Sequence, residues 1–455
     1  MKIGFGKAVI TPPVGFSLVG YFHDRRSTGI RDELYSTACL IEDGGTLFAV
    51  ASVELVWIDS ATVNSVREIV RKTIDIPASN ILIHATHTHT GPISGNSGRD
   101  VYKRRFYSEP CYIEMLPFYI AGSIKAAYES RKESLSGASS TQAEGLAFNR
   151  RYLLKDGRVI TNPWNRTKDI IKSAGPVDNT LSAVKVTDKK TGMLTGIIVN
   201  FACHPDTLGD NLISADWPGM LRNKLKKQFP CAEVLVLNGP SGDINHINPE
   251  NPGRRGLEVP DHIAETLKNK TVRLLGRIKT DKASGMRAYG KKFAMPAIQV
   301  SPSELKSARE VLKKKKLSED SLQYMVSASL VQIAREQKGK RNKMLEINGF
   351  SIGRDLLVLG LPGEIFTDIS LQIKKLSPFK HTLIAQNSNA QLGYVPSETA
   401  FIHDERNKSI KPGYGTHNLA EAIGIDCSYE TSPLACNVGK SAEKAILKTV
   451  KALLK

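Results

Sequence analysis

The sequence lacks any continuous apolar run of the length that a membrane-spanning helix needs, which excludes a protein anchored by such helices. Its N-terminal segment, MKIGFGKAVITPP, has no apolar stretch of the kind that a secretory signal requires. We therefore expect a soluble protein that is cytoplasmic, or secreted if a signal peptide has been removed. No internal repeat or low-complexity linker interrupts the chain.

Cysteine is also scarce, with six residues in 455 and no CxxC pair. A disulfide scaffold needs far more cysteine for its length, so we expect most of these thiols to be reduced and buried. Only Cys427 and Cys436 are close in sequence. The hydrophobic content of 41% is that of an ordinary globular protein, and a chain of this length buries a sizeable core.

Positive charge is in excess, with a formal net charge of +18. Much of it lies in clusters such as Lys313–Lys316 and Lys338–Lys343, which are typical of solvated surfaces. No nucleic-acid recognition motif accompanies these clusters, so we expect no nucleic-acid partner. Attraction to an anionic substrate or to a membrane surface remains open.

Four short apolar runs each end in a loop that carries a histidine or a carboxylate, and runs of this length read as buried strands. They are Ile81–Ile83 before HATHTHTGP, Gly196–Asn200 before FACHPDTLGD, Val234–Leu237 before NGPSGDINH, and Leu356–Leu359 before GLPGE. Helical patterns occupy Ser60–Thr73, Pro110–Ser130, Pro218–Gln228, His262–Leu275 and Lys440–Lys455. This alternation predicts an α/β fold, in which a mixed, largely parallel β-sheet is flanked by helices and the active site lies in loops at the strand ends.

We expect one domain over residues 1–455, with a helical excursion at about 301–344 that starts at the capping sequence SPSE. The excursion is either a lid or a peripheral helical hairpin without function, and we favour the second interpretation.

Histidines cluster in the strand-end loops. His87 and His89 are two residues apart, so on an extended backbone both side chains would face one metal ion or one substrate. His204 and His246 lie in the loops after two other apolar runs. His84 lies on an apolar run itself, and we expect it to be structural. The alternative for the whole cluster is that these rings only satisfy buried hydrogen bonds.

A catalytic zinc ion takes about three nitrogen or oxygen ligands from the protein and leaves a position for water. His87, His204 and Glu364 would meet that count, because a buried carboxylate at Glu364 needs a metal ion or an arginine as partner. Tyr394 could supply a fourth oxygen, although a buried tyrosine is more often part of a core.

Asp243 and Arg150 are two further candidate site residues, and each also has an interpretation without function. Asp243 follows Gly242, which permits close backbone approach, but such a pair is usually only a turn. Arg150, in Asn149-Arg150-Arg151, could clamp a polar or anionic substrate group or could be surface charge.

The joint order and spacing of several motifs resemble the neutral, non-lysosomal ceramidases, specifically their N-terminal catalytic domain. The motifs are GFGKAVITPP, GYFHDRRSTGIRDELYSTACLIEDG, HATHTHTGP, AFNRR, NFACHPDTLG with SADWPG, NGPSGDIN, LPGE and NSNAQLGYVPSETAF. The resemblance implies a zinc amidase that cleaves the N-acyl bond of a lipid amide such as ceramide. By position it implies His87, His204, Glu364 and Tyr394 as ligands of one zinc ion per chain. It further implies His89 as a catalytic or substrate-binding neighbour and Arg150 as an active-site arginine.

The chain departs from the family in the loop GDINHIN, where Asn245 stands at the position of a family serine with a catalytic part. Ser241 is a poor substitute, so we expect no serine nucleophile. We also expect no C-terminal immunoglobulin-like domain. A smaller or more soluble amide than ceramide becomes plausible as the substrate.

We therefore predict a zinc amidohydrolase in which the metal lowers the pKa of water and polarises the scissile carbonyl. His89 and His246 are the candidate acids for the departing amine, and Asp243 and Arg150 complete the predicted catalytic set. Two alternatives are a zinc esterase or lactam hydrolase and a zinc- or ligand-binding protein without catalysis. Pattern alone does not define the oligomeric state.

Overall fold

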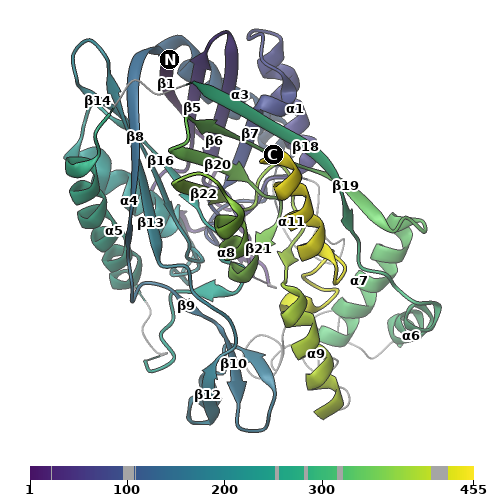
Figure 1. The fold of residues 1–455 in the computed structure, drawn as a ribbon. Helices are drawn as coiled ribbons and strands as arrows, with labels where there is room; N and C mark the ends of the chain where they lie inside the picture. The colour runs from purple at the N-terminus through teal and green to yellow at the C-terminus, as the bar shows by residue number, and fades with distance from the viewer. Residues whose placement is uncertain are drawn as a thin grey trace.

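Two β-sheets packed face to face, with helices outside each sheet, form the core (Figure 1). The computed structural model describes residues 1–21, 23–95, 107, 109–251, 256–280, 285–314, 321–410 and 429–455. Cys427 and the pair Lys315–Lys316, noted in the sequence, lie outside these residues. Of the described cysteines, Cys39, Cys203 and Cys436 are buried, as expected for most of them, and Cys111 and Cys231 are exposed.

The larger sheet has eight strands. In spatial order they are β16 (Glu233–Asn238), β14 (Leu194–Phe201), β13 (Thr180–Asp188), β8 (Lys132–Gln142), β1 (Lys2–Val9), β5 (Tyr35–Asp43), β6 (Thr46–Val53) and β7 (Ile81–Ala85). The smaller sheet consists of β18 (Met286–Pro296), β19 (Asn342–Ile352), β20 (Leu356–Gly360) and β22 (His381–Ala385). All four apolar runs predicted as strands are therefore strands.

The α/β class and the mixed sheet are confirmed, but the predicted predominance of parallel pairing is wrong. In the larger sheet only β14 with β16 and β6 with β7 are parallel, and the other described neighbours are antiparallel. The reason is that short turns join consecutive strands. Gly44 and Gly45, with φ of 54° and 79°, make the tight turn between β5 and β6, and such a turn permits only antiparallel pairing.

Alternate residues of each central strand enter different cores, because successive strand side chains point to opposite faces. Leu235 and Leu237 of β16 join Val358 of β20 in the core between the two sheets, whereas Val234 and Val236 face helices. Burial on both faces explains why these strands read as continuous apolar runs.

Three groups of helices cover the outer faces. Helices α1 (Ser60–Arg71) and α3 (Pro110–Ser130) pack on the β5–β6–β7 part of the larger sheet, and α4 (Asp216–Gln228) and α5 (Glu258–Arg277) pack on its β13–β14–β16 part. Helices α8 (Thr367–Leu376) and α11 (Ala442–Leu453) cover the smaller sheet (Figure 1). These helices confirm the five predicted helical segments. Among the described helices, none has the length and apolar character to cross a membrane.

The predicted helical excursion corresponds to α6 (Pro302–Leu312) and α7 (Leu322–Gln337), which lie in the segment that connects β18 to β19 and pack against each other. Ser301 forms the capping box with Glu304 that SPSE predicted. At the bottom of the view in Figure 1, β10 (Arg151–Leu154), β11 (Val159–Thr161) and β12 (Ile170–Ser173) form a small separate sheet beside α9 (Glu398–Ile410).

Candidate metal centre

The loop after β7 carries the first two histidines of the site. The backbone N–H of His87 donates to the Leu55 carbonyl at 2.8 Å, and that of His89 donates to the Pro205 carbonyl at 3.1 Å. The extended backbone assumed from the spacing is wrong here, because His87 has a φ of 78°. A non-glycine residue in this region is strained, and strain of this kind concentrates at functional sites. Both rings nevertheless face one point.

Three buried imidazoles converge at that point. The Nε2 atom of His87 lies 3.0 Å from that of His204 and 3.4 Å from that of His89, and the His204 and His89 Nε2 atoms are 3.2 Å apart. The three side chains could hold one metal ion. Burial and the neighbouring His87 lower the pKa of His89 and of His204 well below the usual value. Both rings are therefore neutral, which is the form that binds a metal.

Hydrogen bonds distinguish two of these rings from the third. His87 Nδ1–H donates to the Val56 carbonyl at 2.6 Å, and His204 Nδ1–H donates to the Ser241 carbonyl at 3.2 Å. In the neutral form of each ring, this bond places the proton on Nδ1 and leaves the Nε2 lone pair free, as metal-binding histidines require. His89 Nδ1 has no hydrogen-bond partner among the described residues, and its nearest carboxylate, Asp206, is 3.8 Å away.

Glu364 brings a carboxylate to the cluster, with its Oε2 atom 3.2 Å from His87 Nε2. Burial alone would raise the pKa of Glu364, but the adjacent His87 and Arg150 together lower it, so the group is ionised. The two-residue strand β21 (Glu364–Ile365) pairs in parallel with β23 (Tyr394–Val395), and Glu364 lies opposite Tyr394. Burial, followed by the neighbouring Glu364, raises the pKa of Tyr394 well above its usual value.

The loop that contains Gly242 and Asp243 packs against the backbone of Glu364. A Cβ atom at Gly242 would lie 2.5 Å from the Glu364 carbonyl oxygen, so only glycine permits this contact. The Asp243 carboxylate accepts hydrogen bonds from the Thr367 amide and hydroxyl, both at 2.8 Å, and from Asn149 Nδ2 at 2.8 Å. These bonds join the loop to the first turn of α8. The hydrogen bonds of Asp243 thus hold this loop in place against α8 and do not involve the histidines.

Arg150 is buried beside Tyr394. Its Nε atom donates to Glu430 at 3.1 Å, a second guanidinium nitrogen donates to the Gly242 carbonyl at 2.7 Å, and the guanidinium carbon lies 5.2 Å from the Tyr394 ring centre and 5.3 Å from that of Tyr429. Arg150 is therefore not surface charge. Its counterion Glu430 has no exposed surface and was missed in the sequence, because no motif marks it.

Hydrogen bonds hold the side chains of both Asn245 and Ser241. Asn245 donates to Asn162 Oδ1 at 3.0 Å and accepts from the Ile247 amide at 3.0 Å, within the pairing of β17 (Ile244–Asn245) and β9 (Phe148–Asn149). The Ser241 hydroxyl accepts from Gln386 at 2.8 Å, and its carbonyl anchors His204.

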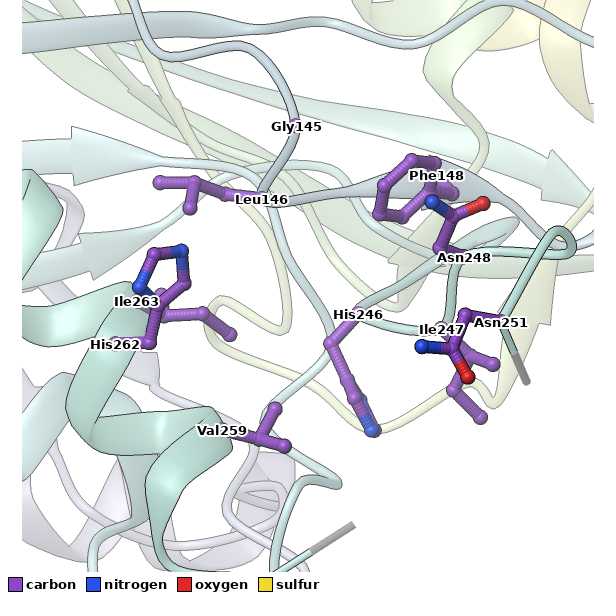
Figure 2. A pocket seen from close by; sticks show the side chains of 10 residues that line it. All are labelled: Gly145, Leu146, Phe148, His246, Ile247, Asn248, Asn251, Val259, His262 and Ile263. Carbon is purple, nitrogen blue, oxygen red and sulfur yellow. The ribbon is translucent and has the colours of Figure 1, made fainter. Parts of the chain in front are cut away.

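His246 lies in the wall of a different pocket, of about 130 Å³, which also contains His262 and Asn248 (Figure 2). None of the three clustered histidines lines this pocket. Of the two candidate acids, the structure therefore brings only His89 to the cluster. His84 is structural as expected, because its ring bridges the Gln386 carbonyl and the Asn238 amide.

Three residues that the sequence patterns did not identify as part of the site surround His89: Tyr21, Arg25 and Asp206. The Tyr21 ring packs edge-on against His89 at 5.4 Å between ring centres, and the Tyr21 hydroxyl donates to Asp206. Arg25 lies over the Tyr21 ring at 4.2 Å and donates to the His89 carbonyl. Both segments stand in motifs noted above, but only the fold reveals that they meet.

Comparisons with solved structures show which fold the chain shares. A crystal structure of the neutral ceramidase from Pseudomonas aeruginosa matches all of this chain and 74% of its own, with 17% identity and a TM-score of 0.74. A ceramidase structure described as complexed with C2 matches to the same extents, with 17% identity and a TM-score of 0.72. No curated protein matches the sequence. At this identity, the likeness shows a shared fold.

Fold and site define an α/β protein with a buried cluster of three histidines. The model of the family described as neutral/alkaline non-lysosomal ceramidase, N-terminal, matches residues 1–233. The chain belongs to the neutral/alkaline non-lysosomal ceramidase family, as the sequence motifs predicted. Family and fold together support an amide-bond hydrolase.

Proposed function

We propose that this protein is a zinc-dependent hydrolase that uses water to cleave the carbon–nitrogen bond of an N-acyl amide. The observation that carries the proposal is the convergence of three buried imidazole Nε2 atoms beside an ionised carboxylate. Burying such a carboxylate without a cationic partner would be costly. One zinc ion per chain would supply such a partner in direct contact, in addition to the positive charge of Arg150.

The donor geometry fits zinc. Two nitrogen ligands about 2.0–2.1 Å from a tetrahedral zinc ion lie roughly 3.4 Å apart, close to the 3.0 Å between His87 Nε2 and His204 Nε2. Glu364 Oε2 has no hydrogen-bond partner within the described residues. We assign His87, His204 and Glu364 as ligands, with Tyr394, opposite Glu364 in the strand pair, as the fourth. Zinc bound there would activate water and polarise the scissile carbonyl.

His89 is the proposed proton carrier. Its ring is neutral and its Nε2 atom points at the donor cluster, so it can take the proton of the attacking water at Nε2 and return it to the departing amine. Its Nδ1 has no carbonyl anchor of the kind that fixes His87 and His204, which supports a role other than ligand. Arg150 holds Tyr394 from the side and adds positive charge near the developing oxyanion.

Water rather than serine is the proposed nucleophile. Asn245 replaces the family serine and its amide is engaged in the loop, and Ser241 is bonded to Gln386. Family membership supports a lipid amide as substrate, and the departure at Asn245 keeps a smaller N-acyl amide within the proposal.

The test combines metal analysis with a substrate panel. The purified protein should contain about one zinc per chain and hydrolyse at least one N-acyl amide among short- and long-chain amides, esters and lactams. Chelation should abolish the activity and added zinc should restore it. Stoichiometric zinc without hydrolysis of any substrate across the pH range would refute the enzymatic proposal and favour a binding protein. Hydrolysis of esters or lactams alone would refute the amide specificity.

Variants test the ligands. His87→Ala and His204→Ala should lose zinc and activity together, whereas His262→Ala, which removes an exposed histidine in the separate pocket, should retain both. Full retention of zinc in an inactive His204→Ala protein would contradict its assignment as a ligand.

A further inference from the structure

A second cavity, of about 500 Å³, lies at the opposite ends of the strands that lead to the metal centre. Strand β20 begins at Leu356 in the wall of this cavity and leads towards Glu364, and β22 begins just after Lys380 and leads to Gln386. The cavity is therefore separated from the histidine cluster by the length of these strands.

Four cationic residues, all of them exposed, are among those that line the cavity: Arg277, Lys279, Arg354 and Lys380. The only carboxylate among the lining residues is Asp355, whose Oδ1 atom is 3.7 Å from Lys380 Nζ. In the described part of the chain, no carboxylate lies within ion-pair distance of the three other cations. Four cationic residues around one cavity attract anions, and a bound anion would offset the repulsion between their charges.

Backbone contacts hold in place the segments that carry these cationic residues. A Cβ atom at Gly137 of β8 would lie 2.1 Å from the Lys279 carbonyl oxygen, so glycine lets the segment after α5 pack directly on the strand. The amide of Lys380 donates to the Arg354 carbonyl at 3.2 Å, and that of His381 donates to the Asp355 carbonyl at 2.8 Å. The charges thus come from backbone segments that are fixed relative to one another, as a binding site requires.

The shape and chemistry of the cavity favour a compact oxyanion. Guanidinium groups donate hydrogen bonds in pairs to phosphate oxygens, and lysine adds point charge. The buried Ser136 lies in the same wall and offers a neutral polar group. The volume exceeds that of a single phosphate and lies within the range of small-ligand sites.

We propose that this cavity is a second binding site, distinct from the metal centre, for a ligand that carries a phosphate-type oxyanion with at least two negative charges. Arg277 and Arg354 bind the oxyanion from opposite segments, and Lys279 and Lys380 neutralise its remaining charge. The ligand is either a free phosphorylated molecule or the headgroup of an anionic phospholipid, which share this chemistry.

Calorimetric titration of the full-length protein with inorganic pyrophosphate tests the site. The variant is Arg277→Ala/Arg354→Ala, and the matched control is Lys313→Ala/Lys314→Ala, which removes the same charge from an exposed segment elsewhere. The cavity variant should bind at least about tenfold more weakly, because each charge-assisted hydrogen bond contributes strongly, and the control should bind like the wild type. Thermal unfolding verifies that both variants are folded.

Flotation with vesicles distinguishes the two sources. Pyrophosphate binding that depends on the two arginines supports a free ligand. Capture by phosphatidic acid vesicles but not by phosphatidylcholine vesicles, with the same dependence and without pyrophosphate binding, supports a lipid headgroup. Equal losses in both variants would reveal nonspecific charge attraction and overturn the proposal. Unchanged binding in the cavity variant would place the ligand elsewhere, and the absence of binding to either probe would overturn the proposal as well.

Discussion

The Nε2 atoms of His87 and His204 lie 3.0 Å apart, although 117 positions separate the two residues in the chain. Strands β7 and β14 deliver them from distant parts of one sheet, and a backbone carbonyl anchors each ring. The shared anchoring pattern distinguishes these two rings from His89, which faces the same point.

His89→Ala should retain zinc and lose activity. A proton carrier contributes about a hundredfold or more to the rate, so kcat should fall by at least that factor while the zinc content stays near that of the wild type. Zinc analysis and steady-state kinetics on the same preparation check both parts. If His89→Ala loses zinc to the extent that His204→Ala does, His89 is a third nitrogen ligand and the proposed division of roles is wrong.

Gly242→Ala should disturb the metal centre without altering any ligand. Its new Cβ atom would lie 2.5 Å from the Glu364 carbonyl oxygen, so the Glu364 backbone must shift. We expect zinc affinity to fall by at least about tenfold, as for losses of supporting contacts at other metal sites. Gly122→Ala in α3 is the control, because nothing lies within 4 Å of its added Cβ. Equal zinc affinity in the two variants would contradict this supporting role.

Glu430→Gln should destabilise the fold, because it leaves the buried Arg150 guanidinium without its counterion. Removing one partner of a buried ion pair costs about 3–5 kcal/mol. The matched exposed change, Glu398→Gln, removes the partner of Lys444 and should cost less than about 1 kcal/mol. Chemical denaturation measures both free energies of unfolding. Similar small costs would show that Arg150 finds other compensation.

His84 should make stability fall in acid. Burial, as the main cause, lowers the pKa of His84 from 6.5 to about 4 in the folded protein. The unfolded chain therefore binds a proton between these values and the native state does not. This contribution is fully present above pH 6.5 and is lost as the pH falls towards 4, with a size of about 3 kcal/mol. His84→Gln should flatten the acid slope of the unfolding free energy, and an unchanged slope would contradict the assignment.

Much of the architecture follows from local patterns. The segment Pro110–Ser130 was predicted as a helix and is α3, with the same bounds, and Leu356–Leu359 was predicted as a strand and lies in β20. Strand direction was not predicted correctly, because apolar runs indicate burial on both faces and not the direction of the neighbouring strand. The Gly44–Gly45 turn between β5 and β6 is the local feature that indicates an antiparallel pair there.

The site was predictable where a motif carries the residue. His87, His204 and Glu364 stand in loops with a distinctive sequence, and the structure brings them together. Glu430 stands in no quoted motif, and the motif that contains Tyr21 does not indicate which residue Tyr21 contacts. They reach the site through contacts across 280 and 185 positions, to Arg150 and Asp206 respectively. His246 lies in a loop after an apolar run, as the clustered histidines do, but the direction of its side chain depends on the pairing of β17 with β9.

The most direct test of the metal assignment is anomalous diffraction at the zinc absorption edge, from crystals of the full chain grown with zinc. The account predicts one strong peak about 2.0–2.1 Å from both His87 Nε2 and His204 Nε2 and within bonding distance of a Glu364 carboxylate oxygen. A strong zinc peak elsewhere in the molecule, or no peak among these side chains at saturating zinc, would contradict it.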